Sequence, residues 1–207
     1  MPSTLPALDA DPQKKADWLE AEYGSRFRAL MDEATELVEE PESLDRRALR
    51  LVEIAREMAG KIAPLTPCGN GCSHCCKQPV VISSWEAARI AKFTGRKPVD
   101  PDGIIPAQDN VERLRLRYAG VPCPMLRNDR CTIYAVRPLA CIGHHSLAAD
   151  PSVCDITRSP GITVQGINDE EFVFIQTGLF FAAGCKSADI REFFPMSDAR
   201  NSGAKSG

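Results

Sequence analysis

Four cysteines and one histidine fall within nine residues of this chain, in the segment Cys68-Gly69-Asn70-Gly71-Cys72-Ser73-His74-Cys75-Cys76. Cysteines that serve only as small hydrophobic side chains scatter along an apolar period, so this density indicates chemistry rather than packing. The spacing Cys68-x3-Cys72-x2-Cys75 lets three sulfur atoms converge when the chain curls into a loop, and the intervening glycines tolerate that curl. The segment therefore predicts ligation of a metal ion or an iron–sulfur cluster, with reactive redox cysteines as the alternative.

Disulfide bonds explain this segment poorly. Adjacent Cα atoms lie about 3.8 Å apart, which is closer than relaxed disulfide geometry allows, so Cys75 and Cys76 are not expected to pair with each other. The total of nine cysteines is odd, which also fits a disulfide framework badly. Residues 1–20 contain no apolar signal-peptide core, and we therefore expect a cytoplasmic protein, in which clustered thiols stay reduced and bind metal.

A second informative stretch begins at Cys123. In Cys123-Pro124-Met125-Leu126-Arg127-Asn128-Asp129-Arg130-Cys131-Thr132-Ile133-Tyr134, two short apolar runs flank an Asn-Asp pair. This pattern predicts a small β-hairpin with a cysteine at each base. The chain continues through Arg137-Pro138 to Cys141, and we expect a turn of helix to begin at the proline.

With both stretches in hand, the sequence resembles the zinc- or iron-chelating cysteine-cluster family, also called the CxxCxxCC domain. The resemblance covers about residues 65–145 and includes the run from Val80 to Ser83 and Glu86 between the two motifs. It departs from the family at Ile142, where members usually carry an arginine. The family's members are named as zinc- or iron-chelating, several are described as iron–sulfur proteins, and one branch is associated with methylation of lysines in flagellin. The resemblance implies metal binding by the seven motif cysteines, Cys68, Cys72, Cys75, Cys76, Cys123, Cys131 and Cys141.

Seven thiols exceed the needs of one site, because a closed zinc site takes four ligands and a [4Fe–4S] cluster usually takes four thiolates. They could serve two sites, or one site plus structural thiols. The surplus favours iron–sulfur over zinc, and we expect Cys75 to complete the set begun by Cys68 and Cys72 while Cys76 faces a second site or the core. Arg137 could donate hydrogen bonds to a thiolate or form a structural salt bridge.

The remaining chemical side chains leave alternatives open. His74 is a ligand, a hydrogen-bond donor to one, or a surface residue. His144 and His145 follow the second motif closely, and either could approach the metal or simply lie in a loop. Cys154 and Cys185 lie outside the motifs, and the ordinary interpretation of each is a buried or free thiol.

Apolar side chains at spacings of three and four predict helices over residues 11–39 and 43–62, which should pack as an antiparallel hairpin. Further along, we expect an extended run at 80–82, a helix from a Ser83–Glu86 capping box to Thr94, a loop over 96–106 and a charged helix over 108–118. Residues 148–167 should form a loop, 168–183 a buried helix, and 187–194 a last short helix. The predicted fold is mainly α with a small β-hairpin and irregular cysteine-rich loops around a metal site.

The expected organisation is a disordered tail (1–10), a helical hairpin (11–63), a cysteine-cluster metal-binding domain packed on it (64–195) and a second disordered tail (196–207). The net charge of −3 gives no reason to expect nucleic acid or an anionic membrane as a partner, and the apolar stretches are too short to span a bilayer. A protein partner and the oligomeric state stay open.

Three functional classes fit these observations. The first is a small metal-binding protein that holds a [4Fe–4S] cluster or zinc through clustered thiolates. The second is an iron–sulfur-dependent modifying enzyme, resembling a lysine N-methylase or performing other radical or redox chemistry, because Cys68-x3-Cys72-x2-Cys75 has the spacing of a radical S-adenosylmethionine motif. No series of βα units for a barrel accompanies that motif. The third is a structural zinc domain that binds a protein partner.

Overall fold

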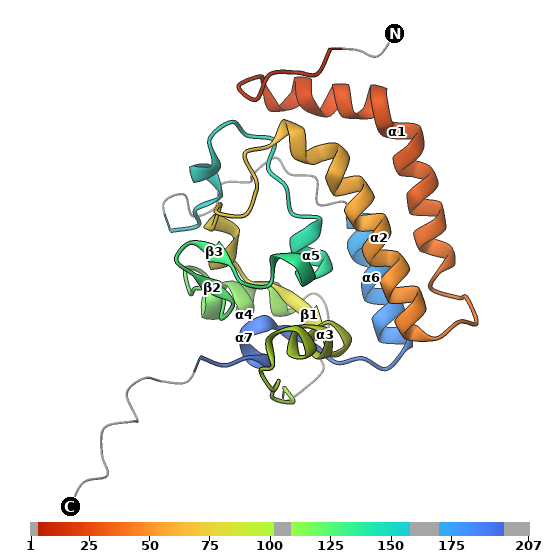
Figure 1. Ribbon diagram of the computed structural model, residues 1–207, viewed down its shortest axis with the longest axis vertical. Helices are drawn as coiled ribbons and strands as arrows, with labels where there is room; N and C mark the ends of the chain where they lie inside the picture. Colours follow the sequence, from red (N-terminus) through yellow and green to blue (C-terminus); the bar gives the residue numbers. More distant parts are fainter. Residues whose placement is uncertain (1–3, 102–108, 158–169, 197–207) are drawn as a thin grey trace, which may run out of the picture.

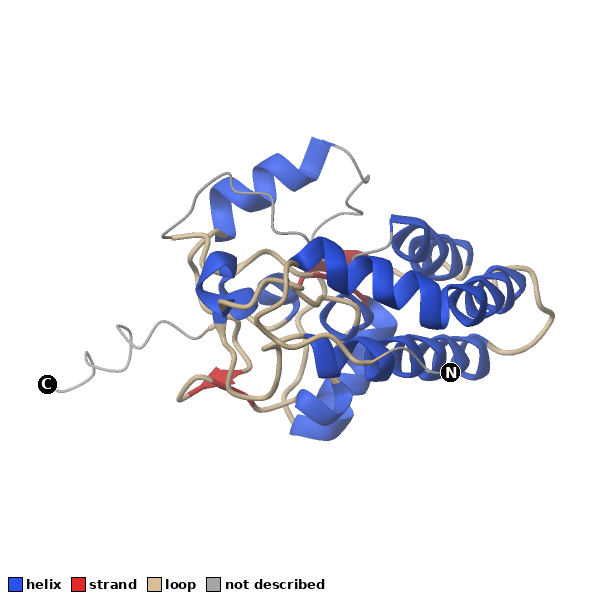
Figure 2. Ribbon diagram, turned by 90° about the horizontal axis from the view of Figure 1, so that it is seen from above, coloured by secondary structure: helices blue, strands red, loops and turns tan. Residues whose placement is uncertain are grey.

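The computed structural model describes residues 4–101, 109–157 and 170–196. Most of its regular structure is helix, with loops between short strands (Figures 1 and 2). The helices are α1 (Pro12–Glu36), α2 (Leu44–Ile62), α3 (Ser84–Thr94), α4 (Asp109–Tyr118), α5 (Leu139–Ile142), α6 (Glu170–Ala182) and α7 (Ile190–Phe193). Four 3-10 turns join them, at Ala63–Leu65, His74–Lys77, Tyr134–Val136 and Pro151–Cys154. The predicted fold class, mainly α with a small β-hairpin and cysteine-rich loops, is confirmed.

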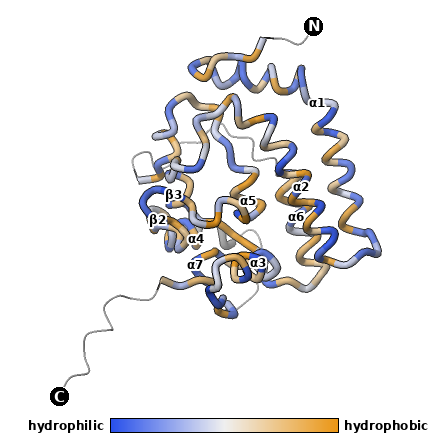
Figure 3. The backbone as a smooth tube through the Cα atoms, viewed as in Figure 1, coloured by the Kyte–Doolittle hydropathy of each residue, from blue (hydrophilic) through white to orange (hydrophobic). Residues whose placement is uncertain are grey.

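Helices α1 and α2 form the predicted antiparallel hairpin (Figure 1), and α6 packs against α1. Each of the first two helices begins at a side-chain cap, because Asp11 accepts a hydrogen bond from the Gln13 amide and Ser43 accepts one from the Arg46 amide. Hydrophilic and hydrophobic positions alternate along both helices (Figure 3), and the apolar positions bury one shared core. Its most deeply buried members include Leu30, Ala34, Ala48, Leu51, Ile54 and Leu179.

Helix α6 was predicted to be a buried helix, and this prediction is wrong for one side. Phe172 and Leu179 pack into the helical core, whereas Phe174 and Phe181 are 80% and 72% exposed. The continuous apolar run of α6 has almost no helical period, so the sequence does not reveal which side meets the rest of the chain. The predicted cap at Asn168 lies outside the described residues, as do Gln108 and the tail from 197.

The capping box that opens α3 is confirmed. The Ser83 hydroxyl accepts from the Glu86 amide, and the Glu86 carboxylate accepts from the Ser83 amide. Gly95 ends the helix with a φ of 71°, in the left-handed region that favours glycine. The other carboxylate oxygen of Glu86 accepts a hydrogen bond of 2.9 Å from the Leu139 amide. One buried carboxylate therefore caps both α3 and α5.

Two small antiparallel pairs complete the fold. Strands β2 (Leu126–Arg127) and β3 (Arg130–Cys131) form the predicted hairpin, with φ values of 49° at Asn128 and 55° at Asp129 in the turn. Strand β1 (Val81–Ser83) pairs with β4 (Ser187–Asp189). The prediction of a helix over 187–194 is wrong for its first three residues, because they pair with β1 and Asp189 then caps α7 by accepting from the Arg191 amide.

A second apolar core lies between β1, α3, the β2–β3 hairpin and α7. Its buried members include Ile82, Ile90, Met125, Ile133, Ala188 and Phe194. Cys76 and Cys131 pack against this core from one side, so it supports the cysteine-bearing segments directly. Among the described residues, no helix has the length and apolar character needed to cross a membrane. The division into a hairpin, a cysteine-cluster domain and two tails stays a prediction.

Candidate metal centre

Eight of the nine cysteines line one cavity of about 340 Å³. All seven motif cysteines are among them, and the eighth is Cys154, which the sequence analysis did not assign to the site. All nine cysteines are free thiols. Cys185 stands apart, because it packs against the helical core between α1, α2 and α6. The structure therefore brings the two motifs together around a common space.

The first cysteine segment curls as its glycines predict. Gly71 has a φ of 123°, which an L side chain rarely adopts, and the Cys72 amide donates to the Gly69 carbonyl at 3.0 Å. A 3-10 turn from His74 to Lys77 follows and carries Cys75 and Cys76. This local curl places all four cysteines of the segment on the cavity wall.

The second motif is attached to the first by the main chain. The Cys123 amide donates to the Cys76 carbonyl at 2.7 Å, and the Gly120 amide donates to the Lys77 carbonyl at 2.8 Å. The β2–β3 hairpin then presents Cys131, and α5 presents Cys141. Because Glu86 caps α5, the position of Cys141 is tied to the end of β1.

Apart from Cys75, which interacts with thiols on both sides, the electrostatic neighbours of each thiol divide the eight cysteines into two groups. Burial raises the pKa of Cys72, and the thiols of Cys68, Cys75 and Cys154 raise it further. Burial likewise raises the pKa of Cys141, and the thiols of Cys75, Cys123 and Cys131 raise it further. We call Cys68, Cys72, Cys75 and Cys154 the first tetrad, and we call Cys76, Cys123, Cys131 and Cys141 the second tetrad.

Cys75 and Cys76 are the contact between the tetrads. The hydrogen bond from the Cys76 thiol is the main cause that lowers the pKa of Cys75 to about 7, and the same bond raises the pKa of Cys76. Cys75 also interacts with the thiols of Cys131 and Cys141. The pair therefore loses its first proton from Cys75, and a metal that displaces the remaining proton from Cys76 would let both sulfurs act as ligands.

Main-chain amides point at several of the sulfurs. The Ser146 amide donates to Cys68 Sγ at 3.4 Å. Three other thiols, those of Cys72, Cys123 and Cys131, each receive a backbone hydrogen bond from the residue two positions further on. This hydrogen bond lowers the thiol pKa, although burial has the larger effect and raises it. Hydrogen bonds of this kind stabilise a thiolate relative to a thiol. The donor set therefore fits a metal or cluster that requires thiolate ligands.

Arg137 supplies positive charge to the cavity wall. Its guanidinium lies 4.3 Å from the centroid of the Tyr134 ring. The arginine charge lowers the pKa of Cys75, although the hydrogen bond from Cys76 is the larger cause. Of the two roles considered for Arg137, stabilisation of thiolates is the one that this placement favours.

The three histidines lie in different surroundings. His144 lines the cavity, its Nε2 atom is buried without a hydrogen-bond partner among the described residues, and burial lowers its pKa. His145 is only 4% exposed, and burial lowers its pKa to about 4. The Nδ1 atom of His74 lies 3.7 Å from an Asp155 carboxylate oxygen. His144 is therefore the histidine that could approach a metal in the cavity.

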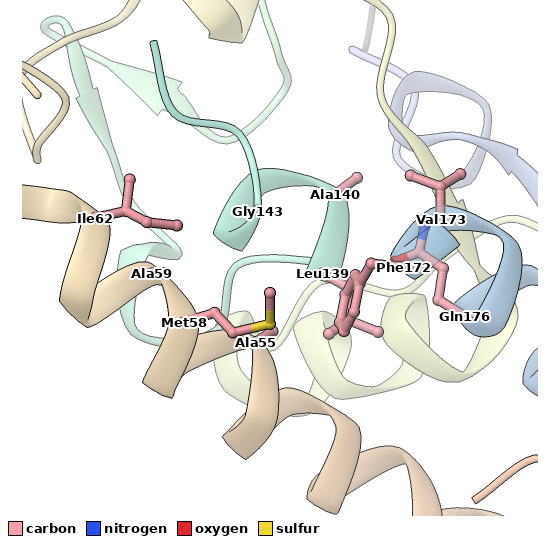
Figure 4. A pocket seen from close by; sticks show the side chains of 10 residues that line it. All are labelled: Ala55, Met58, Ala59, Ile62, Leu139, Ala140, Gly143, Phe172, Val173 and Gln176. Atoms are coloured by element: carbon pink, nitrogen blue, oxygen red, sulfur yellow. The ribbon is translucent and has the colours of Figure 1, made fainter. Parts of the chain in front are cut away.

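A water-sized cavity of about 30 Å³ adjoins this wall between α2, α5 and α6 (Figure 4). Val173 and Gln176 of α6 and Ala140 of α5 line both cavities. The Gln176 Oε1 atom is buried without a hydrogen-bond partner among the described residues. Through these residues the helical layer forms one wall of the cysteine cavity.

The thiols surround a space rather than converge on one point. Within the described ranges, no three histidine, cysteine or acidic side chains are grouped closely enough to hold one metal ion as they stand. The identity of the ligands therefore stays a prediction that rests on the cavity lining and on the thiolate-stabilising contacts.

Residues 67–159 match the model of the CxxCxxCC family, which is described as a putative zinc- or iron-chelating domain. This confirms the resemblance inferred from the two motifs and indicates a zinc- or iron-chelating function for the segment. The matched range also includes Cys154. Comparison with curated proteins and with solved structures gave no match.

Proposed function

We propose that this chain binds two metal centres, each held by the four thiolates of one tetrad. The observation that carries the proposal is the cavity of about 340 Å³ lined by eight cysteines from both motifs. Four thiolates are the usual ligand set of a [4Fe–4S] cluster and of a structural zinc site. The first tetrad has three motif cysteines, Cys68, Cys72 and Cys75. Cys154 supplies its fourth thiol.

We further propose that the centres are [4Fe–4S] clusters rather than zinc ions. Thiolates bound to one zinc ion at about 2.3 Å lie within about 4 Å of one another and leave no space between them. The cavity here has room for several water molecules, as a cluster with its own inorganic sulfide requires. The amide donors and Arg137 would offset the negative charge that four thiolates add to such a cluster.

Anaerobic purification with iron, zinc and sulfide analysis tests this proposal. We expect about equal amounts of iron and acid-labile sulfide and a broad visible absorption band, because thiolate-ligated iron–sulfur clusters are coloured. A colourless protein with two zinc ions per chain would retain the four-thiolate centres and overturn the cluster. A chain that binds neither metal after reconstitution would overturn the metal-binding function itself.

A further inference from the structure

A buried ion pair outside both cysteine motifs contacts the main chain at the end of the first motif and just before the second. Asp189 is fully buried and Arg191 is 5% exposed. The Arg191 Nη1 atom donates to the two Asp189 carboxylate oxygens at 2.9 and 3.1 Å. Both residues belong to the β4–α7 segment, which begins after the end of the family match at residue 159.

The guanidinium of Arg191 connects three points of the cysteine-bearing chain. Its Nη2 atom donates to the carbonyls of Cys76, Gln78 and Val121, at 3.4, 3.1 and 2.5 Å. The first two carbonyls follow Cys75 in the first motif, and the third lies two residues before Cys123. Asp189 adds a fourth point, because its carboxylate accepts from the Val80 amide at 2.7 Å.

These contacts converge on the junction between Cys76 and Cys123. The Cys76 carbonyl accepts from both Arg191 and the Cys123 amide. The arginine therefore fixes the main chain where the segment of Cys76 meets the segment of Cys123.

Geometry explains why an arginine is suited to this position. A planar guanidinium presents five donors in a fixed fork, so one side chain can bind a carboxylate and several carbonyls together. Loss of the guanidinium would leave the Asp189 carboxylate and the carbonyls buried without these donors. A buried ion pair persists only where such additional hydrogen bonds offset its desolvation.

We propose that Asp189 and Arg191 are positioning residues of the metal centre, which hold Cys76 and Cys123 of the second tetrad in register. The inference rests on the proposed metal-binding function. It extends the functional unit beyond the matched family segment to the β4–α7 segment near the end of the described chain. The proposal assigns no ligand role to either residue, because both act through the main chain.

The test uses the full-length, anaerobically reconstituted protein and compares Arg191→Met with two control variants and with a second substitution of Arg191. Substitution of a residue that orients metal ligands without binding the metal typically weakens metal affinity by 10- to 100-fold. We therefore expect Arg191→Met to release iron to a chelator at least about tenfold faster than the wild type, with an altered visible spectrum. Arg117→Met removes a largely exposed arginine of α4 that pairs with Glu192 of α7, and it should leave both readouts unchanged.

Leu51→Ala controls for a general loss of stability, because Leu51 is buried in the helical core away from the cavity. It should unfold more easily yet keep the wild-type spectrum and release rate per folded chain. Arg191→Lys keeps the charge but loses the planar set of five donors, so it should resemble Arg191→Met. It replaces Arg191→Met in the test if that variant does not fold. The proposal would be overturned if the Arg191 variants released iron at the wild-type rate and kept the wild-type spectrum. It would also be overturned if Leu51→Ala changed both readouts as much as the Arg191 variants do.

A second readout separates this proposal from the proposed function. In metal-free protein, iodoacetamide should alkylate Cys76 and Cys123 at least about tenfold faster in Arg191→Met than in the wild type or Leu51→Ala, because the buried junction opens. If the wild type binds no metal, the proposed function fails, and this alkylation rate still decides the role of the ion pair. Equal rates in all three proteins would overturn that role.

Discussion

The helical layer and the cysteine cavity are stabilised by different means. The layer of α1, α2 and α6 has helices of 25, 19 and 13 residues that share a continuous apolar core. The cavity wall is built from shorter pieces, including a four-residue helix and two-residue strands. Such short elements are not stable by themselves. The comparison teaches that the first region relies on apolar burial, whereas the second relies on cross-links through main-chain hydrogen bonds and buried charges, to which the proposed function adds metal.

Removal of the metal should separate the two regions most strongly. We expect chelation to remove hydrogen-exchange protection from residues 65–145 first and to leave α1 and α2 partly protected, because metal binding is coupled to local folding. The loss of stability should amount to several kcal/mol, as for other structural metal sites. Hydrogen exchange by mass spectrometry measures this, and a uniform loss of protection along the described chain would contradict the comparison.

Serine substitutions should distinguish the metal held by the first tetrad from the metal held by the second. Cys75→Ser and Cys154→Ser should each lose the centre of the first tetrad, about half of the bound metal, and retain the other. Cys76→Ser should retain at least part of the metal held by the first loop, because Cys76 belongs to the second tetrad. Metal analysis per folded chain decides this, with Cys185→Ser as a control outside the cavity. Complete loss in both Cys75→Ser and Cys76→Ser would mean that the pair acts as one unit.

A substitution that creates a cavity in the helical layer should destabilise the protein without changing its metal content. Leu51 is fully buried, and Leu51→Ala should lower the free energy of unfolding by about 2–5 kcal/mol. Leu49→Ala, at a position that is 48% exposed, should cost far less. Denaturant unfolding measures both effects. Metal content that falls with Leu51→Ala would show that the two regions are not energetically distinct.

The stability that Glu86 contributes by linking the two regions should depend on pH. Burial raises the pKa of Glu86 above its ordinary value of 4.5, so its contribution to stability is fully present below that pH and is lost as pH rises through the folded-state pKa. In metal-free protein, the unfolding free energy of the wild type minus that of Glu86→Gln should therefore fall as the pH rises above 4.5. A difference that does not change with pH would contradict the assignment.

Glu86→Gln should also cost about 1–3 kcal/mol in hydrogen bonding, because one carboxylate oxygen that accepts from a buried amide is replaced by a donor. Both Ser83 and Leu139 amides now bind this carboxylate. A stability close to that of the wild type at every pH would show that Glu86 does not hold α3 and α5 together.

The sequence was most informative where a local pattern determines the structure. Apolar periods and caps predicted α1, α2 and α3, and the Asn-Asp turn predicted the β2–β3 hairpin. The family resemblance carried by the two motifs implied seven of the eight thiols on the cavity wall. Long-range partners were not visible in this way. Strand β4 is three residues long and depends on β1, and a lone Cys154 or Arg191 carries no local signal.

One clue to Cys154 was present in the sequence, because seven motif cysteines are one short of two sets of four. The separation of Asp189 and Arg191 from both motifs offered no comparable clue, since only tertiary structure brings them to the Cys76 carbonyl. The exposed side of α6 was missed for a related reason. Its apolar residues have almost no helical period, so only the packed structure shows which of them meet a neighbour.

The most direct test of the two-tetrad account is a crystal structure of the anaerobically prepared protein with anomalous scattering measured at the iron edge. We expect two separate iron-containing centres inside the cavity, one bound by Cys68, Cys72, Cys75 and Cys154 and the other by Cys76, Cys123, Cys131 and Cys141. A single centre that takes thiolates from both tetrads, or iron bound outside this cavity, would contradict the account.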